Sequence, residues 1–166
     1  MSMLPGPAGQ DRSPESAIMD AVFEAAGRWA KAEGGKAIVA EDPQHSIDLI
    51  VADQSGGLVA AVSWGGDGAS DESREPSGSL LEGVVNVALS RPLSLDAGKG
   101  KAIARTLDLC HGLREAVTGI DHAKADWLQR PPRYSGKTPV AVRGDRLLNG
   151  YLLRFTVTYL RGDPED

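Results

Sequence analysis

The stretch Ser135 to Thr138, read Ser-Gly-Lys-Thr, is where this sequence comes nearest to a phosphate-binding loop. The full motif requires a glycine five residues before the Gly-Lys pair, and that position holds Pro131. It also requires a helix after the loop, but Pro139 follows directly. The backbone amides that would surround a phosphate are therefore not arranged, and we expect no nucleotide site here.

The histidines and the single cysteine offer no better chemistry. His45, His111 and His122 share no metal-ligand spacing. One cysteine, Cys110, excludes an internal disulfide framework, and its place in an apolar helical stripe favours a small core residue over a nucleophile. Without a plausible base, nucleophile or metal set, we expect a protein that is not an enzyme and needs no cofactor.

Four acidic residues gather in one polar segment, residues 65–79, which contains alanine as its only apolar member. They are Asp67, Asp71, Glu72 and Glu75. Their spacing lacks the calcium-loop pattern, so a solvated loop or a contact surface for a basic partner is favoured over a metal site.

Charge is distributed unevenly along the chain. Residues 41–96 hold ten acids and two bases, whereas residues 124–146 hold six bases and two acids. One interpretation is ordinary solvated surface. The other is that an acidic surface of one copy meets a basic surface of the next, head to tail. The candidate interface residues are then Asp67, Asp71, Glu72 and Glu75 on the acidic side, and Arg130, Arg133 and Lys137 on the basic side.

Length and composition place the chain among ordinary globular proteins. Its 166 residues fit one domain, and 41% hydrophobic content supports a real core. A net charge of −5 argues against a dedicated nucleic-acid binder, and no apolar run approaches the length of a membrane span. Residues 1–12 are rich in glycine and proline, so we expect a disordered tail followed by a single domain over residues 13–162.

Hydrophobic periodicity predicts two helices and several strands. Helices are expected from Ser13 to the Gly34-Gly35 pair and over residues 96–117. Strands are expected over residues 36–40, 47–52, 58–64, 80–90, 125–129, 139–142 and 150–160, with a long loop over residues 65–79. The order predicts an α+β fold, with a mostly antiparallel β-sheet and two main helices packed on one face.

The last strand carries the clearest pattern. Tyr151, Leu153, Phe155, Val157 and Tyr159 alternate with more polar residues, so they share one face. We expect this strand to lie inside the sheet with its aromatic face against a helix.

Three strand sequences carry a resemblance to a known family. They are Gly-Leu-Val-Ala-Ala-Val-Ser-Trp at residues 57–64, Glu-Gly-Val-Val-Asn-Val-Ala-Leu at 82–89 and Leu-Arg-Phe-Thr-Val-Thr-Tyr at 153–159. Together with the amphipathic first helix, this order is similar to that of the tail terminator proteins of long-tailed bacteriophages. The resemblance runs over most of residues 14–161, and the segment at residues 125–150 is longer than the family pattern.

The resemblance implies a structural virion protein. Such a protein forms a homohexamer ring on the last ring of tail-tube protein, ends tail polymerisation and presents a surface to the head–tail connector protein. DNA passes through the ring lumen, no membrane is involved, and the viral tail is assembled in the cytoplasm of the bacterial host. No functional residue carries over individually. The alternative that remains open is a small bacterial α+β domain that binds a ligand or a partner.

Overall fold

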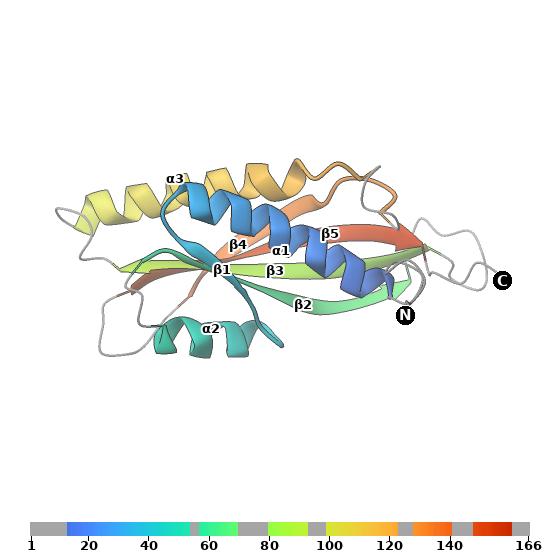
Figure 1. Ribbon diagram of the computed structural model, residues 1–166, viewed down its shortest axis with the longest axis horizontal. Helices are drawn as coiled ribbons and strands as arrows, with labels where there is room; N and C mark the ends of the chain where they lie inside the picture. The colour runs from blue at the N-terminus through green and yellow to red at the C-terminus, as the bar shows by residue number, and fades with distance from the viewer. Residues whose placement is uncertain are drawn as a thin grey trace, which may run out of the picture.

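The computed structural model describes residues 13–53, 57–69, 80–92, 99–122, 128–140 and 148–160. Within these ranges the chain forms three helices and a five-stranded sheet of order β1-β2-β3-β5-β4 (Figure 1). The elements are α1 (Pro14–Ala32), β1 (Lys36–Val39), α2 (Pro43–Ala52), β2 (Val59–Ala69), β3 (Leu80–Pro92), α3 (Lys99–Thr118), β4 (Arg133–Val140) and β5 (Leu148–Leu160). The β1–β2 pair is parallel and the other pairs are antiparallel, which confirms the predicted α+β class.

Both ends of α1 follow from its sequence. Ser13 caps the helix, because its side-chain oxygen accepts a hydrogen bond from the Ser16 backbone N–H at 3.1 Å. At the other end Gly34 adopts φ 83°, a conformation that favours glycine. The Gly35 and Gly34 N–H groups donate back to the carbonyls of Ala30 and Lys31, as in a Schellman motif.

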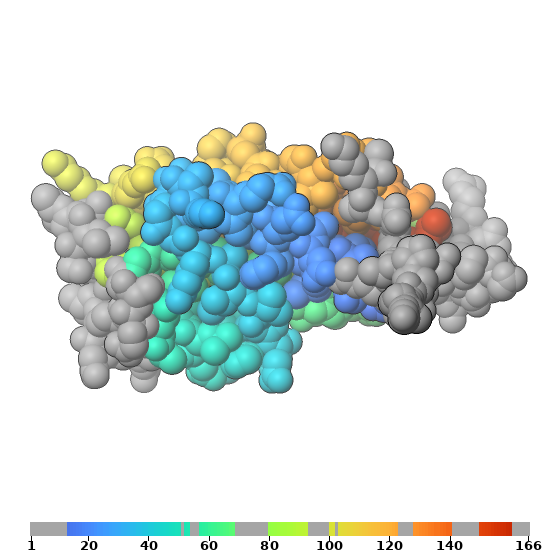
Figure 2. All heavy atoms as spheres, viewed as in Figure 1, coloured from blue at the N-terminus to red at the C-terminus, as the bar shows by residue number. Residues whose placement is uncertain are grey.

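The main core lies between the sheet and the pair α1 and α3. Both long helices cover the same face, and the space-filling view shows them next to each other over the sheet (Figures 1 and 2). Alternate residues of β2, β3 and β5 meet the apolar stripes of these helices, which confirms the predicted packing of two helices on one face. The aromatic face of β5 behaves as expected, since Phe155 and Tyr159 are fully buried and Tyr151 packs partly buried against the same core.

A third helix, α2, covers part of the opposite face. The expected strand over residues 47–52 is therefore wrong, because residues from Pro43 onward form a helix. Asp42 caps this helix by accepting from the His45 N–H at 2.8 Å, and Pro43 occupies its first turn. Ser46 and Ile50, four residues apart, are both buried, and Ile50 packs on Val59 and other residues of β2 and β3.

Strand β2 is longer than the sequence predicts. Residues 65–69, expected in a loop, continue β2 and pair with β3 after a register shift between Trp64 and Asp67. Backbone pairing with a neighbouring strand does not require apolar side chains, so a glycine-rich stretch can still extend a strand. The rest of the expected loop, residues 70–79, lies outside the described residues.

Strand β4 also differs from expectation. It spans Arg133–Val140 and begins directly after Pro131-Pro132, whereas a short strand over residues 139–142 was predicted. It is an edge strand, which is why Pro139 is tolerated within it. Of the expected strand over residues 125–129, the described part contributes an isolated bridge from Leu128 to Tyr159. The expected tail at residues 1–12 and helix start at residues 96–98 lie outside the described residues.

Candidate assembly surfaces

The sheet has two unlike lateral edges. On one side β1 pairs with Val59 to Val62 of β2, and within the described residues no strand pairs with the same side of β2 beyond that point. On the other side β4 is the edge strand along its whole length. Asp67 of β2 is level with Gly83 and Val157, and Arg133 of β4 is level with Thr156. An acid and a base from the candidate interface set therefore lie at the same end of the sheet, on opposite edges.

Asp67 is held in place from the core side. The Tyr159 hydroxyl of β5 lies 3.1 Å from Asp67 Oδ2 and 2.9 Å from Glu15 Oε2 in the first turn of α1. A phenol has one proton to donate, so it satisfies one of these carboxylates at a time. Burial, reinforced by the two carboxylates, raises the pKa of Tyr159 far above its ordinary range, so the hydroxyl stays protonated at neutral pH.

The other predicted acidic residues are Asp71, Glu72 and Glu75, which lie outside the described residues. Two further acids of the acidic half of the chain, residues 41–96, have local structural partners. Asp42 caps α2, and Asp53 forms an ion pair with Lys36 at 2.6 Å, with 8% of the Asp53 side chain exposed. Part of the acidic half thus stabilises the fold rather than forming an open surface.

The basic residues do not share one face. Arg133 is level with Thr156, which belongs to the face away from α1 and α3, whereas Lys137 is level with Leu153 of the main core. A register shift between Tyr134 and Gly136 separates the two. Simple alternation would place Arg133 and Lys137 on the same face, and the inserted residue reverses this. Arg130 and Arg133 instead lie together, around a pocket.

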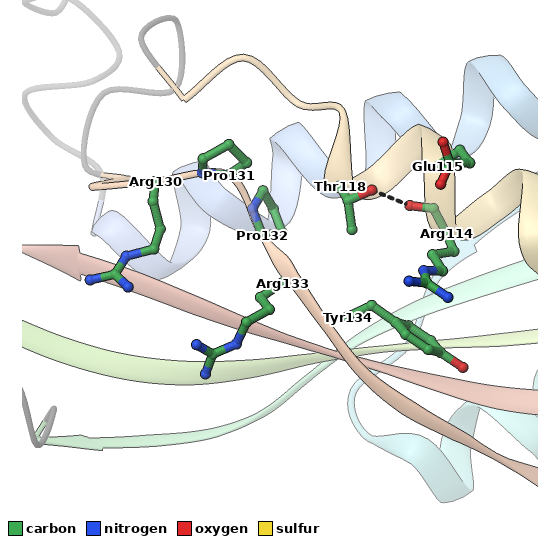
Figure 3. A pocket seen from close by; sticks show the side chains of 8 residues that line it. All are labelled: Arg114, Glu115, Thr118, Arg130, Pro131, Pro132, Arg133 and Tyr134. Atoms are coloured by element: carbon green, nitrogen blue, oxygen red, sulfur yellow. Dashed lines mark hydrogen bonds between the residues drawn. The ribbon is translucent and has the colours of Figure 1, made fainter.

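This pocket lies between the C-terminal half of α3 and the segment that leads into β4 (Figure 3). It has a volume of about 430 Å³ and is largely open to solvent. The residues that line it are Arg114, Glu115, Thr118, Arg130, Pro131, Pro132, Arg133 and Tyr134. The Arg114 guanidinium carbon lies 4.5 Å from the centre of the Tyr134 ring, a cation–π arrangement.

Two motifs singled out in the sequence have structural roles. Ser135 to Thr138 lie within strand β4, and the Ser135 and Thr156 hydroxyls share a hydrogen bond of 2.6 Å, so this stretch is not a phosphate-binding loop. Cys110 is buried in α3 at 2% exposure. Burial raises the pKa of its thiol to about 11 against the opposing charge of Lys137, which leaves it protonated at neutral pH.

The described ranges contain neither a metal-binding cluster nor a membrane-spanning helix. No group of three or more His, Cys, Asp or Glu side chains is placed to hold a metal ion in that part of the chain. Within the same ranges, every helix is too short or too polar to cross a bilayer.

Neither protein-family models nor curated proteins match this chain.

Sequence reasoning missed the residues that organise both surfaces. Glu15 suits the first turn of a helix, but its contact with Tyr159 joins positions 144 residues apart, which no local pattern predicts. Arg114 was not singled out, although it lines the pocket with Arg130 and Arg133. The Pro131-Pro132 pair was the available signal, since it marks a rigid segment within the basic stretch of residues 124–146.

Proposed function

We propose that this protein is a structural subunit of a phage tail, a terminator that forms a closed homohexamer ring, caps the tail tube and joins it to the head connector. It acts without catalysis and without a cofactor. Its partners are further copies of itself, tail-tube protein and connector protein, with DNA passing through the lumen. It functions in the virion tail after assembly in the host cytoplasm.

One observation carries the proposal: the sheet ends laterally in two different edges, with Asp67 on the β2 edge and Arg133 and Lys137 on the β4 edge. A closed ring needs two different complementary surfaces on each subunit, because every interface is head to tail. The β2 edge presents Asp67, and the β4 edge presents Arg133 at the same end of the sheet. Exposed charges of this kind set the encounter rate and the register more than the affinity.

The resemblance in element order supports the specific role. A first amphipathic helix, the strands at residues 57–64 and 82–89, a second helix and the Thr-, Val- and Tyr-rich final strand follow the order seen in tail terminators. The strands all belong to one five-stranded sheet, and the two helices pack on it.

The proposal is tested by measuring whether the purified protein assembles into rings. Sedimentation of the purified protein, alone and mixed with tail-tube protein, should give a hexamer mass, and electron micrographs should show rings capping tube ends. A protein that stays monomeric even beside tail tubes would exclude the ring.

A second function, a ligand- or partner-binding bacterial domain, is favoured by the pocket of about 430 Å³ between α3 and β4. The volume falls within the usual range of ligand sites. Binding of a ligand by a protein that stays monomeric beside tail tubes would favour this alternative.

A further inference from the structure

The pocket between α3 and β4 has the charge of an anion site. Two arginines, Arg114 and Arg133, line it against one acid, Glu115. We propose that this pocket binds an extended acidic segment of a partner protein, whose carboxylates pair with the guanidinium groups. Arginine suits this task because its planar fork of donors matches a carboxylate in a bidentate pair.

Arg114 is held in place before any ligand arrives. Its guanidinium lies over the Tyr134 ring, 4.5 Å from the ring centre. That ring in turn meets the fully buried Phe155 at 5.8 Å between centroids and an angle of 61°. Because a buried core residue supports the ring and the ring supports the cation, less side-chain entropy is lost when Arg114 binds a carboxylate.

The opposite wall is rigid as well. Pro131 and Pro132 have restricted backbone angles, and Pro132 is buried. The chain is anchored before them, where the Gln129 N–H donates to the Thr158 carbonyl at 2.9 Å, and after them, where Arg133 enters β4. Arg133 therefore projects from a segment that is fixed on both sides.

The distribution of charge favours a peptide with several carboxylates. Figure 3 shows Arg133 extending to one side of the prolines, while Arg114 lies on the other side over Tyr134. A single small anion would reach only part of this set, whereas an extended segment can place one carboxylate near each end. The prolines offer an apolar wall for the methylene groups of such side chains.

Nucleic acid fits the same pocket less well. Binding of single strands usually relies on aromatic rings that stack with bases. The aromatic ring of this pocket, Tyr134, is already engaged by Arg114 and by Phe155.

The test is direct binding of a fluorescein-labelled hexaglutamate peptide, followed by fluorescence anisotropy at low salt. A hexaglutamine peptide of the same length is the control. We expect hexaglutamate to bind at least about tenfold more tightly, with an affinity that falls as salt screens the charges. Equal binding of the two peptides would overturn the proposal, as would tighter binding of an oligothymidylate than of hexaglutamate.

Variants locate the site. Arg114→Gln and Arg133→Gln should each weaken hexaglutamate binding by up to about fivefold, the effect of removing one exposed charge pair. The matched control is Arg28→Gln, on the exposed side of α1 beside Glu24, which should change the affinity less than about twofold. Tyr134→Phe keeps the ring under Arg114 and should retain binding. An equal loss in Arg28→Gln would overturn the assignment to the pocket.

Folding and assembly are measured separately. Circular dichroism of each variant establishes that it is folded, and sedimentation at the peptide-binding concentration gives its oligomeric state. Peptide binding by a monomer supports this proposal even if the ring is excluded. Conversely, a monomeric sample that fails to bind hexaglutamate overturns this proposal and leaves the proposed function standing. Because the proposed ring interface uses Arg133, binding is measured at a concentration at which the protein is monomeric.

Discussion

The Tyr159 hydroxyl lies 2.9 Å from Glu15 Oε2, so the last strand of the sheet is hydrogen-bonded to the first turn of the first helix. The same hydroxyl lies 3.1 Å from Asp67 in β2, and the Tyr159 ring meets Trp64 edge to face at 6.0 Å. One buried side chain thus connects three elements at the end of the sheet where the acidic edge is exposed.

Tyr159→Phe should destabilise the fold while keeping its packing. The substitution removes the hydroxyl that reaches the two carboxylates, and we expect a loss of about 1–2 kcal/mol in the free energy of unfolding. Tyr151→Phe, on the same strand and face, is the matched control, because its hydroxyl makes no hydrogen bond to any described residue. Urea unfolding measures both, and an equal loss in the two variants would contradict the role given to the Tyr159 hydroxyl.

The same residue should make stability depend on alkaline pH. Burial and the nearby carboxylates raise the pKa of Tyr159 in the folded state, whereas an unfolded tyrosine ionises near about 10. The unfolded state therefore loses its proton first, so this contribution to stability is present below about pH 10 and is lost as pH rises further. The free energy of unfolding, measured with urea, should fall more steeply from about pH 8 to about pH 11 for the parent than for Tyr159→Phe. Parallel curves would contradict this coupling.

Phe155→Ala should be among the most damaging single changes. Phe155 is fully buried in β5 and packs in the main core, so truncation should cost roughly 3–5 kcal/mol. Its neighbour Arg154 is exposed, and Arg154→Ala should change stability by less than about 0.5 kcal/mol. Thermal or urea unfolding compares them, and an unaffected Phe155→Ala would mean that the ring is not in the core.

Gly83→Ala tests close packing at the acidic end of the sheet. A Cβ added at Gly83 would come within 2.7 Å of the Trp64 ring and 3.3 Å of Tyr159, so the rings would have to move. We expect a loss of roughly 1–3 kcal/mol. Gly68→Ala is the matched control on the adjacent strand, because nothing lies within 4 Å of a Cβ there. If Gly83→Ala and Gly68→Ala both have the melting temperature of the parent, Trp64 does not pack against Gly83 as described.

The sequence predicted the amphipathic elements well and the polar ones poorly. In α1 and β5 the apolar residues recur at a clear period, so type and buried face could both be predicted. The run Ile47 to Ala52 was short and apolar, which fits a strand or a helix equally, and the deciding signal was the cap formed by Asp42 and Pro43. Cap chemistry, not periodicity, identifies α2.

The candidate surfaces were only partly predictable. The basic stretch was visible as charge, but its division between two faces depends on one inserted residue at the register shift after Tyr134. The local signal for such a shift is Gly136, which adopts φ 130° there, because a glycine inside a strand often marks a bulge. Arg114 and Tyr134 come from different elements, α3 and β4, so their contact follows from the fold alone.

Charge reversal on the β4 edge tests assembly, and the register makes the test selective. Arg133 is level with Thr156, next to the level of Asp67 at Val157, whereas Lys137 is level with Leu153, farther from that end of the sheet. The double variant Arg130→Glu and Arg133→Glu should therefore weaken ring formation, while Lys137→Glu, the matched control, should affect it much less. Each exposed charge contributes at most about 1 kcal/mol, so the effect should be graded and should shrink with added salt.

Sedimentation at low and high salt measures this difference, and circular dichroism establishes that each variant is folded. A ring that forms equally well in the parent and the double variant at every ionic strength would contradict the pairing of the acidic β2 edge with the basic β4 edge. If Lys137→Glu weakens the ring as much as the double variant does, the contact is not confined to the end of the sheet where Asp67 lies.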